Sequence, residues 1–178
     1  MQFAFTQNEI KIDTSKSFVK WTGSNVFKFN KHYGIVKFKN GKINQNRDTI
    51  IGGRFEIDMN SIINTDGKYN EMLVWHLKNE DFFDVKKHPI SKLEIISVKY
   101  IDSIHLDVNA NLKIKNITLP IEYKSILKRD DDKIILKSKF IIDRTRWKIN
   151  YESKSILGSL KDDIISDAIE FEVIITTK

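Results

Sequence analysis

Apolar and polar residues alternate over long stretches of this chain. In the clearest stretch, Ser103 to Lys115, every second residue is apolar: Ile104, Leu106, Val108, Ala110, Leu112 and Ile114. A period of two places apolar side chains on one face of a strand and polar side chains on the other. This stretch therefore predicts a strand with one buried face and one solvated face, and His105 falls on the solvated face.

The same alternation recurs along most of the chain. It is clear in 51–59, 134–142 and 169–175, and weaker in 19–23, 33–39, 92–100 and 119–127. Connections such as Asn40-Gly41, Asn116 and Arg129 to Lys133 are too short for helical crossovers, so antiparallel neighbours are expected. Gly52-Gly53 lies inside a strand pattern, where a bulge is the usual meaning. About eight strands are predicted.

One segment follows a different period. Between Asn70 and Asn79, Leu73 and Leu77 are four residues apart, which predicts a short helix. About eight strands with one apolar face must either close on themselves or pack on a second sheet. We expect an all-β fold, an antiparallel barrel with one short helix, and a two-sheet sandwich is the alternative.

Composition narrows the class of protein. The 178 residues contain 29 Ile and 3 Ala, a balance that favours strands over a helical bundle. The length suits one domain, taken as residues 1–178, and no Pro/Ser/Gly-rich linker divides it. The absence of Cys excludes disulfides, thiolate zinc sites and a cysteine nucleophile. The four histidines have no ligand spacing, so no metal site is expected. No Gly-rich phosphate loop or nucleotide fingerprint occurs, so no other cofactor is expected.

The charge pattern bears on partners. The net charge is +6, but acidic and basic residues are mixed and form no block, so no nucleic-acid partner is expected. A mildly basic surface is compatible with transient contact with a membrane surface. No apolar run approaches the ~20 residues of a membrane span. The first residues lack a signal sequence, so we expect a periplasmic or exported protein if a signal has been removed, and a cytoplasmic one otherwise.

Several short motifs occur in a characteristic order. They are Trp21-Thr22-Gly23, His32-Tyr33-Gly34-Ile35-Val36, Gly41-Lys42-Ile43, the segment from Gly52 to Ile62, the segment from Leu77 to Pro89 with the Phe82-Phe83 pair between acids, Leu112 to Thr118, Asp143 to Trp147, and Leu160 to Ile169. In this order they resemble the YceI-like family, from about Thr14 to Ile175. The Phe82-Phe83 pair with its flanking acids and downstream Pro89 is the most specific element.

The resemblance implies a lipocalin-like, extended barrel that encloses a long-chain isoprenoid or a similar amphipathic lipid, without a catalytic or metal constellation. The sequence departs from the family at Asn116, where the pattern usually has Gly, but Asn also tolerates left-handed turns. The implied function is noncatalytic binding, storage or transport of the lipid. A second copy of the chain, in a homodimer, is also counted among the partners to test. A barrel of about eight strands is wide enough either to be filled by side chains or to hold a ligand.

Two polar residues point inward by strand parity. His32 shares strand parity with Val36 and Phe38, so its side chain is expected to face inward. Its role is either a polar contact for a lipid headgroup or that of a hydrogen-bonded core histidine. Gly34 beside it either makes room for a ligand or lets two strands approach. Arg144 shares parity with Phe140 and Ile142, and either binds an anion or forms a structural salt bridge with Asp162, Asp163 or Asp167.

The predicted lipid-binding residues combine these positions with the motif aromatics. They are Trp21, His32, Gly34, Val36, Phe38, Phe55, Ile57, Phe82, Phe83, Leu106, Val108, Leu112, Phe140, Ile142, Arg144 and Trp147. Phe82 and Phe83 are expected to close one end of the barrel, with Asp81 and Asp84 as turn residues. Two alternatives stay open: an enzyme acting on an isoprenoid-type apolar substrate with His32 as base and Arg144 as anion clamp, and a filled barrel that serves as an interaction module.

Overall fold

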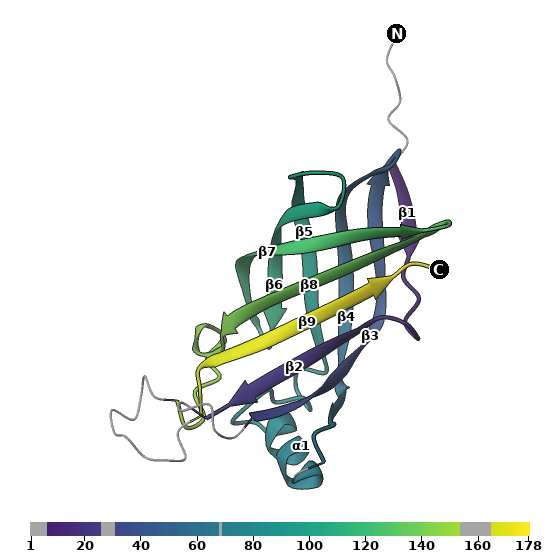
Figure 1. The fold of residues 1–178 in the computed structure, drawn as a ribbon. Coiled ribbons are helices and arrows are strands. Elements are labelled where there is room, and N and C mark those ends of the chain that lie inside the picture. The colour runs from purple at the N-terminus through teal and green to yellow at the C-terminus, as the bar shows by residue number, and fades with distance from the viewer. Residues whose placement is uncertain (1–6, 26–30, 68, 154–164) are drawn as a thin grey trace.

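The computed structural model describes residues 7–25, 31–67, 69–153 and 165–178, and these are mostly strands. The elements, in chain order, are β1 (Gln7–Lys11), β2 (Phe18–Ser24), β3 (Lys31–Asn46), β4 (Thr49–Asn64), α1 (Asn70–Lys78), β5 (Ile90–Tyr100), β6 (His105–Ile114), β7 (Ile117–Asp130), β8 (Lys133–Asp143), the 3-10 helix η1 (Arg144–Trp147) and β9 (Ala168–Thr176). Figure 1 shows how they are arranged.

The strands form a closed antiparallel barrel. Eight of them pair in the cyclic order β3-β2-β9-β8-β7-β6-β5-β4, and β4 pairs again with β3 to close the ring. The ninth, β1, pairs with the Lys42 to Asn46 half of β3, beyond the half that pairs with β2. The barrel of about eight strands predicted from the alternation is confirmed, and the sandwich is excluded.

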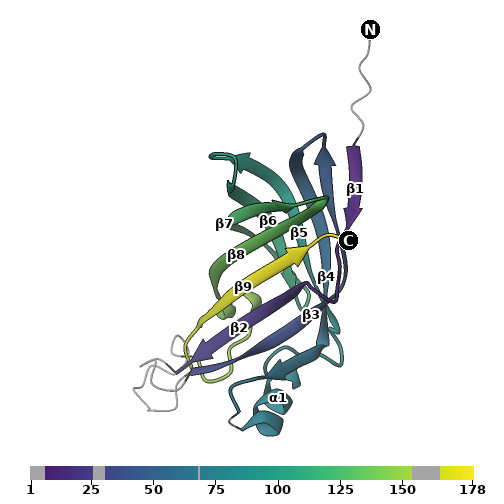
Figure 2. The ribbon, with the colours of Figure 1, turned by 45° about the vertical axis from the view of Figure 1, so that its right-hand side comes forward.

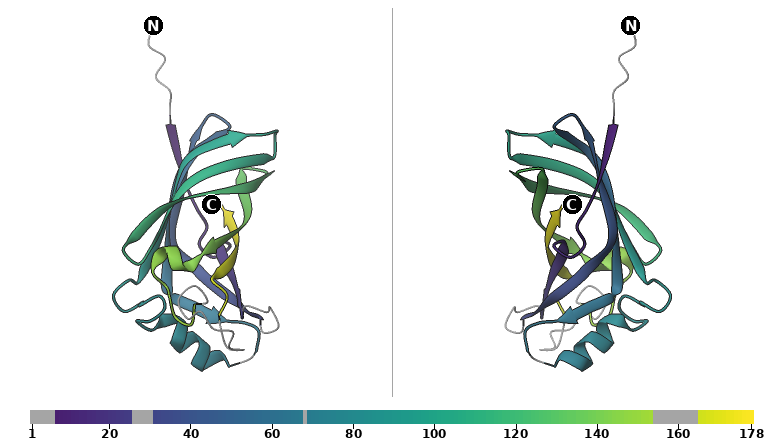
Figure 3. Two further views of the ribbon diagram at one scale, coloured as in Figure 1. Left: turned by 90° about the vertical axis from the view of Figure 1, so that its left-hand side faces the viewer. Right: turned by 90° about the vertical axis from the view of Figure 1, so that its right-hand side faces the viewer.

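The described connections that contain α1 and η1 lie at one end of the barrel. Helix α1 follows β4 and precedes β5, and η1 follows β8. Figures 1 and 2 show α1 at the lower end of the barrel. The C-terminal ends of β2 and β8 and the N-terminal ends of β3 and β9 lie at the same end. Figure 3 shows the same end from two sides, with α1 lying across it. We call this the α1 end.

Most elements lie where the hydrophobic pattern predicted them, and α1 is confirmed to within one residue. β1 was not anticipated from the sequence. The expected turn at Asn40-Gly41 is wrong, because β3 continues through both residues and the turn lies at Arg47-Asp48, where Arg47 has a φ of 52°. A Cβ atom at Gly41 would lie 2.6 Å from Phe55 Cδ1, so this glycine permits close packing inside a strand.

Two smaller details of the turns also follow from the backbone. The bulge expected at Gly52-Gly53 lies next to them: the register shifts between Asn44, which pairs with Gly52, and Gln45, which pairs with Ile50. In the turn between β6 and β7, the residue with positive φ is Lys115, at 53°, and not the neighbouring Asn116.

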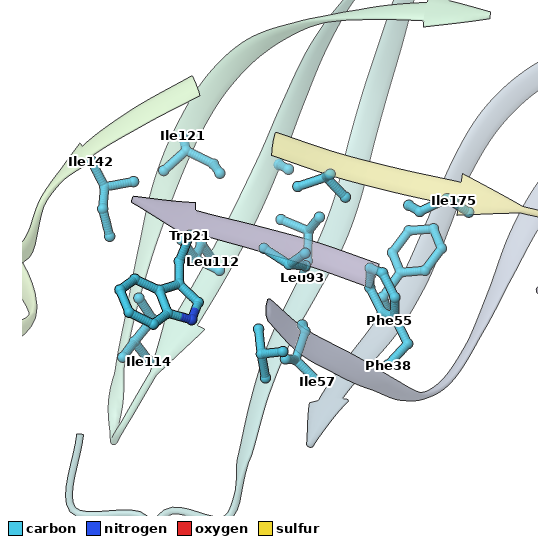
Figure 4. Packing of buried hydrophobic residues seen from close by; sticks show 14 of the residues in the cluster. Trp21, Phe38, Phe55, Ile57, Leu93, Leu112, Ile114, Ile121, Ile142 and Ile175 are labelled. Atoms are coloured by element: carbon cyan, nitrogen blue, oxygen red, sulfur yellow. The ribbon is translucent and has the colours of Figure 1, made fainter. Parts of the chain in front are cut away.

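The core lies inside the barrel, and side chains fill the end away from α1. Ile43, Ile50, Phe55 and Leu106 are each no more than 2% exposed there. Phe55 packs edge to face on Phe38, with 6.0 Å between ring centroids, and Figure 4 shows this pair beside Ile175. This half of the barrel is therefore filled by its own side chains.

Candidate functional site

The α1 half of the barrel contains a cavity of about 340 Å³. Volumes of this order are typical of small-ligand sites. Its wall comes from seven of the barrel strands, β2, β3, β4, β5, β6, β8 and β9, and from α1, the loop that follows α1, and η1. A second cavity, near Val108 and Tyr123, has a volume of only about 10 Å³. The barrel thus has one roomy half and one filled half.

Apolar side chains form most of the wall. Ten of the predicted residues line this cavity: Trp21, His32, Val36, Phe38, Ile57, Phe82, Phe83, Leu112, Phe140 and Arg144. Figure 4 shows Trp21 near Leu112 and Ile114, with Leu93 and Ile57 farther along the interior. Phe82 and Phe83, in the loop that follows α1, form an edge-to-face pair with 4.9 Å between centroids, and both line the cavity.

The remaining predicted residues do not line the large cavity. Phe55, Leu106, Ile142 and Trp147 are buried in the surrounding core, and Val108 lines only the small cavity. At Gly34 a Cβ atom would lie 1.8 Å from the Ile63 carbonyl oxygen and 2.7 Å from Trp21 Cζ2. The absence of a side chain at Gly34 therefore serves close strand approach and not ligand space.

Strand parity alone did not identify all of the wall. Residues missed from the sequence include Val19, Met59, Ile62, Leu73, Leu77, Leu93, Ile114, Ile169, Phe171 and Val173. The parity of β9 and the four-residue spacing of Leu73 and Leu77 could have indicated several of them. Which inward residues face open space depends on how the strands curve, and no sequence signal marks that.

Polar groups of the cavity gather at the α1 end. Ser24 is the last residue of β2 and Asn25 follows it. His32 lies near the start of β3, Arg144 follows β8, and Ser166 precedes β9. Ser166 N–H donates to the Ser24 carbonyl oxygen at 2.8 Å, which ties two of these segments together. The cavity therefore has an apolar body and a polar end, the arrangement that an amphipathic ligand requires.

Arg144 is fully buried, and its donors are largely engaged by the protein itself. Its Nε, Nη1 and Nη2 donate to the carbonyl oxygens of Ser166, Ile149 and Ile165 at 3.1, 2.9 and 3.3 Å. Asp167 lies 3.4 Å from Nη2, as an ion pair. Burial lowers the pKa of the Arg144 guanidinium, and the charge of Asp167 opposes this shift.

These contacts give Arg144 the geometry of a structural clamp between η1 and the residues just before β9. Of the three acids proposed as partners, Asp167 is found beside it, whereas Asp162 and Asp163 lie outside the described residues. The guanidinium also lies over the Phe82 ring, 5.5 Å from its centroid. Arg144 thus holds the loop aromatics and the polar end of the cavity in place.

His32 belongs to a second polar cluster at the same end. Its Nδ1 lies 2.6 Å from Asp66 Oδ2, and the Asp66 side chain is only 5% exposed. Asn64 Nδ2 donates to Asp66 Oδ1 at 2.8 Å and to Asn70 Oδ1 at 2.9 Å, linking the pair to the start of α1. The His32 ring is held in orientation on the cavity wall.

The other histidines are dispersed. His105 is exposed beside Asp102, on the predicted solvated face, and His76 packs on Tyr151 with 5.8 Å between centroids. Within the described residues, no three His, Cys, Asp or Glu side chains come together as metal ligands would.

At the filled end, burial raises the pKa of Tyr123, which stacks on Phe140.

Several solved structures share this fold. The chain is similar to BcnA of Burkholderia cenocepacia, with a TM-score of 0.78 and 15% identity over 94% of this chain and 99% of that one. A polyisoprenoid-binding domain from Saccharophagus degradans, implicated in plant cell wall breakdown, gives a TM-score of 0.68 and 14% identity over 98% and 99% of the two chains. The YceI protein of Campylobacter jejuni gives 0.58 and 19% over 73% and 74%.

None of the curated proteins compared with the chain matches it significantly. The sequence model of one protein family, the YceI-like domain, in contrast matches residues 10–177. This range includes every strand of the closed barrel and every residue of the cavity wall. The chain belongs to the YceI-like family.

Proposed function

We propose that this protein binds a long-chain isoprenoid or a similar amphipathic lipid, without catalysis, and stores or carries it within the barrel. The observation that supports this most directly is the 340 Å³ cavity with an apolar body and a polar end. Burial of an apolar chain stabilises a complex by about 25 cal/mol per Å². Family membership and the polyisoprenoid-binding name of one structural neighbour point in the same direction.

Native mass spectrometry of gently purified protein tests whether a lipid occupies the cavity. We expect a mass increment that is released by organic extraction and is restored by a polyprenyl lipid. A second measurement uses Val36→Phe, because Val36 lines the cavity and a phenyl ring there would occupy ligand space. Lipid uptake should fall about tenfold, which corresponds to about 1.4 kcal/mol.

The matched control is the same substitution at Val108, which lines only the small cavity. Overpacking at Val108 should destabilise the fold by about 1 to 3 kcal/mol, but uptake per folded molecule should stay unchanged. Equal uptake by Val36→Phe and the wild type, with both folded, would place the ligand outside this cavity.

The catalytic alternative rests on the short contact between His32 and Asp66 on the cavity wall. A carboxylate that orients a histidine is a common arrangement in general-base catalysis. The proposed anion clamp has less support, because the Arg144 donors are directed at backbone carbonyls. Formation of a new product from a bound polyprenyl lipid, abolished in His32→Gln, would favour this alternative over simple binding.

A further inference from the structure

Helix α1 has two apolar sides, and only one of them is covered. Leu73 and Leu77 face inward and line the cavity. Tyr69, which precedes the helix, and Met72 and Trp75 are 69%, 57% and 61% exposed. These three residues are spaced by three, so they form a stripe along the helix. We call Tyr69, Met72 and Trp75 the outer stripe.

The outer stripe lies at the end of the barrel where the polar residues of the cavity gather. α1 crosses this end (Figure 2). Asn64 connects the first residue of the helix, Asn70, to the cluster of His32 and Asp66. The opposite end is packed by residues such as Phe55 and Leu106. A lipid that moves between the cavity and its source must therefore pass near α1.

The side chains of the outer stripe suit a bilayer surface. Trp and Tyr combine an apolar ring with a polar group and are enriched where hydrocarbon meets headgroups. A short helix with such a face lies in the plane of the interface. Among the described residues, no helix has the length and apolar character needed to cross a membrane.

We propose that the outer stripe of α1 docks on a lipid bilayer, with Tyr69, Met72 and Trp75 inserted at the level of the headgroups. This inference rests on the proposed lipid-binding function, since docking brings the polar end of the cavity to the membrane that supplies or receives the lipid. The helix then has two roles: Leu73 and Leu77 contact the bound lipid, and the outer stripe contacts the bilayer.

The local charges indicate that apolar insertion dominates. α1 carries Glu71 as well as Lys78, and Lys78 Nζ donates to the Asn60 carbonyl oxygen at 2.7 Å. Docking is therefore expected on zwitterionic phosphatidylcholine, and the net charge of +6 adds a preference for anionic lipids that weakens with salt. A second copy of the chain is a poorer occupant, because a stable dimer buries about 800 Å² per partner and three side chains provide only part of it.

Tryptophan fluorescence provides a direct test. The chain has three tryptophans, and Trp21 and Trp147 are 8% and 0% exposed, so Trp75 reports on the outer stripe. With phosphatidylcholine vesicles we expect a blue-shifted emission, and quenching when the vesicles contain brominated phosphatidylcholine. Sedimentation with the vesicles measures the bound fraction.

Two variants and a control make the test specific. Tyr69→Ser combined with Met72→Ser keeps the Trp75 probe and should reduce vesicle binding about tenfold, as should Trp75→Ser in sedimentation. The matched control is Ile101→Ser, because Ile101 is 55% exposed in the turn after β5, at the end opposite α1. The control should bind as the wild type does.

Three outcomes would overturn the proposal: no quenching in the wild type, equal loss of binding in Ile101→Ser, or a change from dimer to monomer in Trp75→Ser by analytical ultracentrifugation. The last would identify the stripe as an interface between copies. If quenching is absent while native mass spectrometry still finds lipid, only the docking fails. Vesicle binding by a protein whose cavity never takes up lipid would support docking and overturn the proposed function.

Discussion

At the scale of single residues, Arg144 shows how a charged group is accommodated beside an apolar cavity. Its side chain is fully buried, three backbone carbonyls accept its hydrogen bonds, and Asp167 provides a counter-charge at 3.4 Å. A buried guanidinium with this many partners stabilises the fold only as long as all of them remain. Its position links η1, the residues just before β9, and Phe82.

We predict that Arg144→Met lowers stability by about 3 to 5 kcal/mol, because three carbonyls lose their donor and Asp167 loses its counter-charge. Uptake of a polyprenyl diphosphate and of the matching hydrocarbon should then fall by the same factor. Denaturant unfolding and lipid titration measure the two effects. A selective loss of the diphosphate at unchanged melting temperature would instead make Arg144 a headgroup anchor.

At the scale of elements, the barrel depends on close approach between particular strands. Gly34 in β3 leaves no space for a side chain, since a Cβ atom would lie 1.8 Å from the Ile63 carbonyl oxygen. Gly23 in β2, which pairs with His32, has no atom within 4 Å of its Cβ position. These two glycines, on the neighbouring paired strands β2 and β3, thus have opposite packing environments.

We therefore predict that Gly34→Ala destabilises the protein by about 3 kcal/mol, because backbone of β4 would have to move. Gly23→Ala should change stability by no more than about 1 kcal/mol, since the added methyl group meets open space and restricts the unfolded chain. Thermal melts of the two variants side by side make the comparison. Equal melting temperatures would show that β3 and β4 adjust without cost at Gly34.

At the scale of the whole molecule, the barrel is divided into a packed half that maintains the fold and an open half that can take up a ligand. The packed half contains Ile43, Ile50 and Phe55, each at most 1% exposed. The open half contains the 340 Å³ cavity. Because the fold has its own core, the protein should remain folded when the lipid is removed.

Lipid removal should still lower the melting temperature. A ligand that binds only the folded state, at a concentration one hundred times its dissociation constant, stabilises it by about 2.7 kcal/mol. For a chain of this size this corresponds to roughly 5 to 10 °C. Calorimetry before extraction, after extraction and after restoring a polyprenyl lipid measures the shift. The Val36→Phe variant serves as the control and should recover only about half as much, because a tenfold weaker affinity leaves about 1.4 kcal/mol of stabilisation at the same lipid concentration. An extracted wild-type protein that melts like the loaded one would contradict binding in the cavity.

The sequence by itself determined the fold class, because the period of two in β4, β6, β8 and β9 specifies which face of each strand is buried. It also determined α1, from the spacing of Leu73 and Leu77, and the family, from the order of motifs between Trp21 and Ile169. Each of these properties depends on the spacing of residues within one segment or on the order of segments along the chain. For this reason they can be read without knowing how distant segments meet.

Only the tertiary structure decided which inward residues face empty space. The alternation in β3 and in β6 predicts that both Val36 and Val108 face inward. Val36 lines the large cavity, whereas Val108 lines the small one beside Tyr123. It also decided that Gly41 lies within a strand against Phe55, and that the Arg144 donors point to backbone carbonyls. Each of these outcomes depends on atoms from segments distant in sequence, since the curvature of the closed barrel sets their separation, and a one-dimensional pattern does not encode that separation.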